Sequence, residues 1–268
     1  MSSSVPYVTE VTLLPAPNVL RLVYRNILVN TDPGSLVILV GLPGLYLVFF
    51  GFGFQSVASA SGSGSSYLSF LTPGIMSFQV VMAGTVGGSM LWADRRWGML
   101  SQLLMGPFTR LQYLFGIMLT SILFGLGGSA VMLGVAYALL GTGPTLPLSI
   151  GIMFGSIVVG SIFFGALMLF ISAYVKSNTA YNSIQILLLF VVNFASTVFY
   201  PLSSGLPVVL RVLFEVNPLT YVADTVRGAY SGSLTATDVY QMLVLLTEMV
   251  IILFLAVRAY MRADVSYE

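Results

Sequence analysis

The residues best suited to specific polar contacts with a partner are gathered in one short segment, WADRRWGMLSQLLMGPFTR, at residues 92–110. Asp94, Arg95 and Arg96 stand near its start, and Arg110 ends it. Apolar residues recur through it at helical spacing: Trp97, Leu100, Leu103, Leu104 and Phe108. The pattern predicts a short amphipathic helix that lies along a membrane surface and presents its charged face to a partner. The alternative is an ordinary charged loop that fixes topology, which would not need an apolar face.

The rest of the sequence offers little catalytic chemistry. It contains no Cys and no His, which excludes thiolate nucleophiles, thiolate metal sites and imidazole bases. The only lysine, Lys176, has no glycine nearby, so the chain lacks a phosphate-binding loop. We therefore expect no bound cofactor, and any ATP and its Mg²⁺ must be bound by another chain. Ten basic and nine acidic residues nearly balance, which gives no basis for nucleic-acid binding.

The composition places the chain in a lipid bilayer. Hydrophobic residues make up 57% of it and charged residues 7%, whereas a soluble domain carries about 25% charged residues. A helix needs about 20 apolar residues to cross a bilayer. Six runs reach this scale: Ser35–Phe54, Tyr67–Leu91, Tyr113–Leu140, Leu148–Tyr174, Tyr181–Tyr200 and Tyr240–Tyr260. The predicted fold is an all-α membrane protein with six transmembrane helices.

Basic residues indicate the orientation of these spans. With six spans both ends of the chain share one side of the membrane. That side holds most of the basic residues: Arg21, Arg25, Arg95, Arg96, Arg110, Lys176, Arg258 and Arg262. The other side holds only Arg211 and Arg227. We expect a multi-pass protein of the plasma membrane with both termini and segment 92–110 in the cytoplasm.

A second amphipathic helix is expected at the membrane surface ahead of the first span. Apolar residues recur on one face of it: Leu20, Val23, Tyr24, Ile27 and Leu28. Arg21 and Arg25 lie on another face. The chain therefore divides into a cytoplasmic N-terminus with this helix (1–34), a transmembrane domain (35–260) and a cytoplasmic tail (261–268).

Prolines interrupt the chain between the last two spans. Pro201 ends the fifth span, and Pro207 begins an apolar stretch, Leu206–Phe214, that is too short to cross a bilayer. A loop open to water fits poorly because the stretch is too apolar. We expect residues 201–239 to form a re-entrant hairpin at the outer surface.

The second half of this outer region predicts a short helix. Asn217 and Pro218 end the apolar stretch, and Thr220 is expected to cap a helix that runs through Asp224 and Arg227. The spacing of Asp224 and Arg227 permits a surface ion pair worth a few tenths of a kcal/mol. This pair is expected to be structural.

Glu248 is the one clear carboxylate inside a predicted span, about 12 Å along the last helix. A carboxylate at that depth is costly and usually faces a cavity or a partner. We predict a role in gating or substrate passage, together with residues of the outer region: Pro201, Pro207, Asn217 and Pro218. A protonated glutamate in a packed interface is the alternative.

Together these segments resemble the type-2 ABC-transporter permeases, exporter subunits related to daunorubicin-resistance and nodulation-factor export permeases. Residues 67–74 (YLSFLTPG) resemble the start of the family's second span. Residues 94–100 (DRRWGML) and 105–110 (MGPFTR) resemble its cytoplasmic coupling helix and the start of its third span. Tyr200-Pro-Leu, Leu206-Pro, Asn217-Pro-Leu-Thr-Tyr221 and Arg227-Gly resemble its outer region. The resemblance covers most of the chain.

The resemblance implies a permease without enzymatic activity of its own. Two copies would form a dimer, each contacting one separate ATP-binding subunit, and ATP binding would bias the path between inward- and outward-facing states. The N-terminal helix and the coupling helix would seat that subunit. The residues assigned to this contact are Arg21, Arg25, Asp94, Arg95, Arg96, Gly98, Leu100 and Arg110.

The nature of the cargo is less constrained. Uncharged spans favour a lipophilic or amphipathic substrate, drug- or lipid-like, and a polysaccharide or glycolipid is the alternative because related permeases carry those. A secondary carrier would show several intramembrane charges or paired broken helices. A membrane scaffold would not need the apolar face of segment 92–110, so both of these rank lower.

Overall fold

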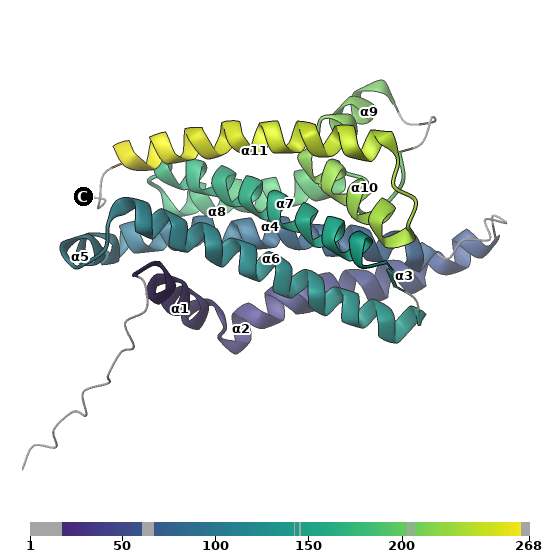
Figure 1. The fold of residues 1–268 in the computed structure, drawn as a ribbon, viewed down its shortest axis with the longest axis horizontal. Coiled ribbons are helices and arrows are strands. Elements are labelled where there is room, and N and C mark those ends of the chain that lie inside the picture. The colour runs from purple at the N-terminus through teal and green to yellow at the C-terminus, as the bar shows by residue number, and fades with distance from the viewer. Residues whose placement is uncertain are drawn as a thin grey trace, which may run out of the picture.

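The computed structural model describes residues 18–60, 67–141, 143–144, 146–202, 205 and 207–263. Over these residues the chain is helical and contains no β-strand. The long helices run side by side in one bundle (Figure 1). Helices α1 (Asn18–Asn30) and α5 (Met99–Met105) lie at the same end of the bundle as the C-terminus, and we call this the α5 end. Residues 1–17 and 264–268 of the predicted terminal segments lie outside the described residues.

The remaining helices follow the predicted spans closely. They are α2 Pro33–Leu36, the π-helix η1 Val37–Gly41, α3 Leu42–Ala60, α4 Tyr67–Arg96, α6 Arg110–Leu140, α7 Pro147–Tyr174, α8 Asn178–Phe194, α9 Val208–Glu215, α10 Pro218–Ser231 and α11 Ala236–Arg262. Within the described part of the chain, five stretches are long and apolar enough to cross a membrane: Pro33–Phe54, Tyr67–Arg96, Arg110–Leu139, Pro147–Tyr174 and Ala236–Arg262. The predicted all-α membrane fold is confirmed.

Helix α8 (Asn178–Phe194) corresponds to the predicted fifth span, Tyr181–Tyr200, but it is shorter than that span. It has 17 residues and ends at Phe194 rather than Tyr200. A helix of that length extends about 26 Å, less than the hydrocarbon thickness of about 30 Å. Six as the number of spans therefore stays a prediction.

Helix α4 is the centre of the bundle. It packs against α7, α6, α10 and α3, and most of its residues are buried. Glycines allow neighbouring helices to approach it closely. A Cβ on Gly84 would lie 2.6 Å from the carbonyl carbon of Phe164 in α7, and one on Gly88 would lie 2.7 Å from the hydroxyl of Tyr181 in α8. Close approach of this kind favours helix association in lipid, where burial of apolar surface gives little driving force.

The first span begins with a capped turn followed by a π-helix. The carboxylate of Asp32 accepts hydrogen bonds from the Ser35 hydroxyl and from the backbone N–H groups of Ser35 and Gly34. These bonds, that of the Ser35 hydroxyl first, lower the pKa of the Asp32 carboxyl. Helix α2 then leads through η1 into α3. π-Segments within helices occur frequently at functional sites, and this one lies beside two cavities.

Helix α1 occupies the position predicted for a surface helix, but its buried face differs from the predicted apolar face. Leu22, Val23 and Asn26 are buried, whereas Leu20 and Tyr24 are exposed. The protein leaves most of the predicted apolar face uncovered because α1 packs on α6 through a mixed strip of residues, so contact of that face with the membrane surface stays a prediction. The Asn26 side-chain amide donates to the Thr120 hydroxyl of α6 at 3.2 Å, which explains a polar residue on the buried face.

The outer region contains two short helices of opposite character. α9 is largely exposed, with Phe214 buried, and α10 is largely buried against α7, α4 and α11. Asn217, not Thr220, caps α10, because its side-chain oxygen accepts from the Leu219 N–H at 3.0 Å and Pro218 takes the first helical position. The re-entrant course predicted for residues 201–239 stays a prediction.

The Asp224–Arg227 pair is not the surface pair that its spacing suggested. The two side chains are joined at 2.7 Å, and the Arg227 guanidinium also donates to the Thr197 carbonyl at 2.8 Å. The same guanidinium lies over the Phe70 ring at 4.0 Å. Arg227 therefore ties α10 to α4 and to the turn after α8.

Replacing Gly84 with Ala should destabilise the bundle by about 1–3 kcal/mol, the usual cost of overpacking. The reason is that the Phe164 backbone cannot give way without moving α7. Gly155→Ala in α7 is the matched control, because no neighbouring atom lies within 4 Å of a Cβ there. Thermal unfolding in detergent should show a lower midpoint for Gly84→Ala alone. Equal midpoints for the two variants would contradict close packing at Gly84.

Candidate functional site

The charged segment 92–110 is divided among three helices. α4 continues to Arg96, α5 covers Met99–Met105, and α6 begins at Arg110. Gly98 adopts a left-handed backbone (φ 69°), which glycine tolerates without strain and which separates α4 from α5. A single helix over residues 92–110 is therefore not observed, although a short helix does lie in the turn between two spans.

Asp94 is the centre of a buried cluster at the α5 end, formed with Arg25 of α1 and Tyr113 of α6. Arg25 binds both carboxylate oxygens, with Nη2–Oδ1 at 2.5 Å and Nη1–Oδ2 at 2.7 Å. The Tyr113 hydroxyl donates to Oδ2 at 2.7 Å. Two-point contacts of this kind are among the strongest ion-pair geometries. The hydrogen bond to Asp94 raises the pKa of the Arg25 guanidinium. The Asp94 cluster therefore joins three helices.

Two other arginines of the segment bind the C-terminal ends of helices. Arg95 is 2% exposed, and its Nη1 donates to the carbonyls of Ser172 and Ala173 in the last turn of α7 at 2.9 and 3.0 Å. Arg110 donates to three backbone carbonyls at the end of α11. Terminal carbonyls lack helical partners and carry partial negative charge, so a cation there is favourable. Both arginines fasten span ends to one another.

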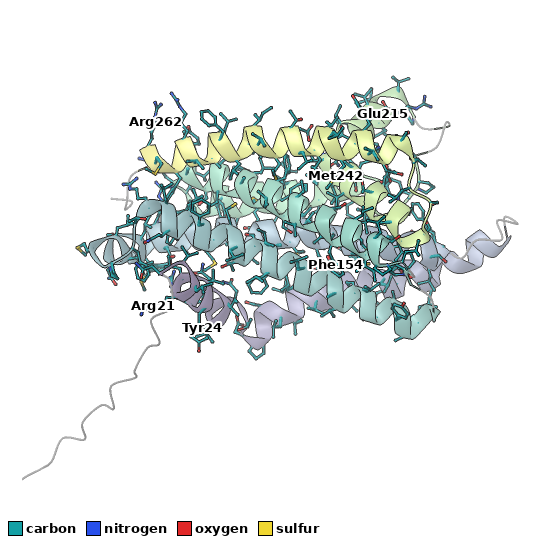
Figure 2. All side chains as sticks on the ribbon, in the orientation of Figure 1. Arg21, Tyr24, Phe154, Glu215, Met242 and Arg262 are labelled. Atoms are coloured by element: carbon teal, nitrogen blue, oxygen red, sulfur yellow. The ribbon has the colours of Figure 1, made fainter. Side chains whose placement is uncertain are left out.

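The exposed surface at the α5 end is formed by other residues. Trp97 is 79% exposed and Met105 is 81% exposed. Arg96 is also exposed, and its guanidinium lies 6.0 Å from the centre of the Trp92 ring. Figure 2 shows Arg21 and Arg262 at this same end, whereas Glu215 lies at the opposite end. The α5 end thus presents cations and a large exposed indole.

The predicted contact residues separate into two groups by burial. Asp94, Arg95 and Leu100 are buried, so they can influence a partner only through the positions of the helices. Arg21, Arg25, Gly98 and Arg110 are partly exposed, and Arg96 is exposed. Contact of these residues with an ATP-binding subunit stays a prediction. The exposed apolar side chain of Met105 was not predicted, because the spacing of residues does not reveal which apolar side chains remain uncovered.

The predicted gating residues lie in different environments. The Oε2 atom of Glu248 is buried and has no hydrogen-bond partner among the described residues. Asn217 is buried, and its amide donates to the carbonyls at the end of α8, both at 2.7 Å. Pro201 and Pro207 are exposed, and Pro218 begins α10. Asn217 therefore joins α8 to α10. Glu248 is one of three residues of α11, with Gln241 and Tyr260, that have a buried polar atom without a partner among the described residues.

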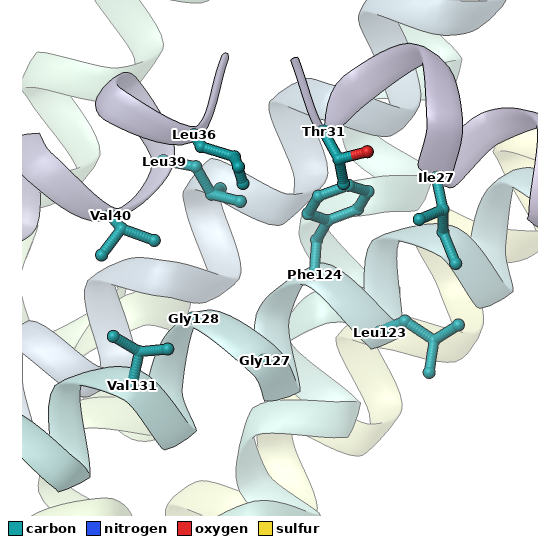
Figure 3. Close-up of a pocket in the computed structure, with 10 residues that line it drawn as sticks. All are labelled: Ile27, Thr31, Leu36, Leu39, Val40, Leu123, Phe124, Gly127, Gly128 and Val131. Atoms are coloured by element: carbon teal, nitrogen blue, oxygen red, sulfur yellow. The ribbon is translucent and has the colours of Figure 1, made fainter. Parts of the chain in front are cut away.

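Two cavities flank η1. The first, about 270 Å³ in volume, is apolar and lies between the α1–η1 segment and α6 (Figure 3). Phe124 points from α6 toward Thr31 and Leu36, with Gly127 and Gly128 beside it. The second, about 160 Å³, lies between η1, α4 and α8 and has a partly polar lining. Only in the three-dimensional structure do the residues of these cavities come together.

Comparison with known proteins identifies this architecture. The family described as "ABC-2 type transporter" matches residues 18–230, from the start of α1 into the last turn of α10. The Cyanophora paradoxa protein named "Putative transport permease ycf38" is 31% identical over 202 residues, which cover 71% of this chain and 66% of that protein, slightly under two thirds of its length. The matched region includes the Asp94 cluster, α5 and both cavities. The chain therefore belongs to the ABC-2 type transporter family and is a multi-pass membrane protein.

Proposed function

We propose that this permease is the membrane subunit of an ATP-driven exporter that provides the path for a lipophilic or amphipathic, drug- or lipid-like substrate. Two copies would assemble with two separate ATP-binding subunits in the plasma membrane, with both termini and the α5 end in the cytoplasm. ATP and Mg²⁺ would be bound by those subunits. The observation that best supports this proposal is the Asp94 cluster, which joins the surface helix α1 to two long spans.

The Asp94 cluster provides a route for mechanical coupling. α1 and α5 lie at the bundle end where a soluble subunit would bind, and both are connected to α4, α1 through Arg25 and α5 through the short turn at Gly98. A partner that displaced α1 would pull on Asp94, and thus on α4 and α6. Such a displacement would shift the population between two arrangements of the spans only if the partner binds them with different affinity.

The surface of the bundle fits a transported amphiphile. Large apolar side chains are exposed along several helices: Val48, Phe49 and Phe52 in α3, Ile186, Leu187 and Phe190 in α8, and Val250, Ile251 and Phe254 in α11. Lipid, a second permease and a lipophilic substrate can all cover surfaces of this kind. Export of a polysaccharide or glycolipid is the second candidate, and the polar lining of the cavity between η1, α4 and α8 favours it.

The first test of the exporter is affinity purification of the permease from native membranes in mild detergent. A P-loop ATPase should be recovered in about equal amount, because the chain has no nucleotide-binding loop of its own. The double variant Arg96→Glu with Trp97→Ala should lower that recovery about tenfold, since exposed arginine and tryptophan often dominate protein contacts. Tyr174→Ala, another exposed aromatic residue, is the control. Recovery of the permease without any ATPase would refute the proposal.

Arg25→Ala should reduce coupling between ATP hydrolysis and transport about fivefold or more, within the usual range of coupling energies. The substitution leaves Asp94 without its cation and releases α1 from α4. Arg258→Ala removes an exposed arginine at the end of α11 and should leave coupling intact. The measurement is the number of substrate molecules transported per ATP hydrolysed in proteoliposomes. An unchanged ratio for Arg25→Ala would show that the Asp94 cluster is only structural.

Glu248→Gln should change the transport rate without loss of assembly, because it retains the shape of a side chain whose Oε2 atom is unsatisfied. Thr247→Val, at a neighbouring exposed position whose hydroxyl bonds its own helix, is the control. Uptake into inverted vesicles and recovery of the ATP-binding subunit are compared for the two variants. Identical transport by Glu248→Gln and the unmodified protein would reject a role in substrate passage.

A further inference from the structure

The smaller cavity beside η1 is a cleft with a floor and two walls. Met82, Thr85, Val86 and Ser89 form the floor, and their spacing places them on one face of α4. The segment from the end of α1 to η1 forms one wall, and α8 forms the other. We call this cavity the α4 cleft.

The lining of the α4 cleft is polar without being charged. Asn30 and Ser35 on one wall and Gln185 on the other join Thr85 and Ser89 of the floor. None of the residues that line it is acidic or basic. Amides both donate and accept hydrogen bonds, as hydroxyls do. The set therefore matches a ligand that carries donors and acceptors but no net charge.

Part of this hydrogen-bonding capacity is already used within the protein. Asn30 donates to a carbonyl of its own helix at 2.9 Å, and the Thr85 hydroxyl does the same at 2.7 Å. Gln185 Nε2 donates to the Ser89 hydroxyl at 3.3 Å, a long bond that joins α8 to α4 at the cleft. These bonds leave the amide oxygens and the hydroxyl lone pairs to accept from a ligand, and one N–H each of Asn30 and Gln185 to donate.

Asp32 lies between the cleft residues Asn30 and Ser35 in the sequence, but it does not make the α4 cleft anionic. Asp32 is exposed, and its oxygens accept the three bonds that cap α2. The Ser35 hydroxyl is turned toward Asp32 by one of these bonds. A cationic ligand would therefore find no carboxylate among the side chains that line the cleft.

The surface that continues from the α4 cleft along α3 and α8 is apolar. Toward the end of the bundle where α9 lies, aromatic rings fill the space between these two helices. Ile38, which lines the cleft, is 61% exposed, and exposed apolar side chains continue along α3 and α8. Aromatic rings then join these helices across α4: Tyr46 with Phe78 and Phe199, Phe50 with Phe199, and Phe194 with Phe199, at centroid distances of 5.7, 5.5, 5.2 and 5.2 Å. The face between α3 and α8 is thus hollow and polar nearer the α5 end and filled by rings at the other.

We propose that the α4 cleft binds the uncharged, hydrogen-bonding head of an amphipathic substrate, one that carries hydroxyl or amide groups, while the hydrocarbon part lies along α3 and α8. This inference rests on the proposed export function and narrows its substrate class. A molecule with an anionic or cationic head would lose the hydration of its charge without gaining an ion pair.

The test compares three fluorescent probes that share a labelled twelve-carbon chain and differ in the head: a glucoside, a trimethylammonium and a sulfate. The full chain is placed in phosphatidylcholine nanodiscs without any ATP-binding subunit, and binding is followed by fluorescence titration. The glucoside should bind at least about tenfold more tightly than either charged probe, which corresponds to about 1.4 kcal/mol.

Two variants assign this binding to the α4 cleft. Thr85→Val, which keeps the side-chain shape, and Gln185→Leu should each weaken glucoside binding about fivefold, as expected for one lost hydrogen bond. Asn182→Leu, at an exposed position on the same helix outside the cleft, should leave it unchanged. The thermal unfolding midpoint of each variant confirms that it is folded.

Equal affinity for the three probes, tighter binding of a charged probe, or unchanged glucoside affinity in both cleft variants would overturn the proposal. No ATPase is present in this titration, so its failure is distinct from failure of the exporter function. That function is tested separately by recovery of an ATPase from native membranes. Preference for the glucoside together with weaker binding by both variants would support the assignment.

Discussion

The ion pair between Arg25 and Asp94 is the contact on which the organisation of the α5 end depends. α1 packs against α6, and it is joined to α4 by two hydrogen bonds from Arg25 to the two carboxylate oxygens of Asp94. Tyr113 adds a third helix to the same carboxylate. A largely buried carboxylate is tolerated only when it is paired and hydrogen-bonded, so each of the three residues requires the other two. The surface helix is thereby held to the membrane-embedded core.

The same end shows why neighbouring charges in one sequence motif can have unrelated roles. Successive residues of a helix point in directions about 100° apart. Asp94 therefore faces α1 and α6, Arg95 faces the end of α7, and Arg96 lies on the surface. Residues 94–96 were all predicted to contact a partner, but each of the three side chains lies in a different environment. The buried members position helices, whereas Arg96 and Trp97 are exposed at the surface.

Much of the fold follows from local sequence, whereas most of the site does not. The scarcity of charge and the length of the apolar runs were sufficient to predict the five stretches that are long enough to cross a membrane, because lipid requires long apolar helices. The start of the first span at Asp32 and Pro33 and the break at Gly98 follow local rules of caps and glycine.

The features that local sequence did not reveal depend on contacts between distant segments. Asn217 rather than Thr220 caps α10, and its amide also binds the end of α8, which spacing alone cannot show. The α4 cleft combines side chains from three distant parts of the chain, residues 30–39, 82–89 and 185. Each of its polar residues looks unremarkable in its own span. Only tertiary packing makes them a set.

The Asp94 cluster and the α4 cleft are connected along the chain by the segment from α1 to η1. The segment that follows α1 forms one wall of the α4 cleft, and Leu39 of η1 lines both this cleft and the apolar cavity on the α6 side. A shift of α1 therefore moves a wall of the cleft relative to its floor on α4. If the Asp94 cluster transmits the movement of a bound ATPase, the same displacement reaches the cleft through the few residues between Asn30 and Leu39. Coupling and substrate binding would then depend on one short stretch of chain, whose π-helical turn is less regular than the α-helices on either side.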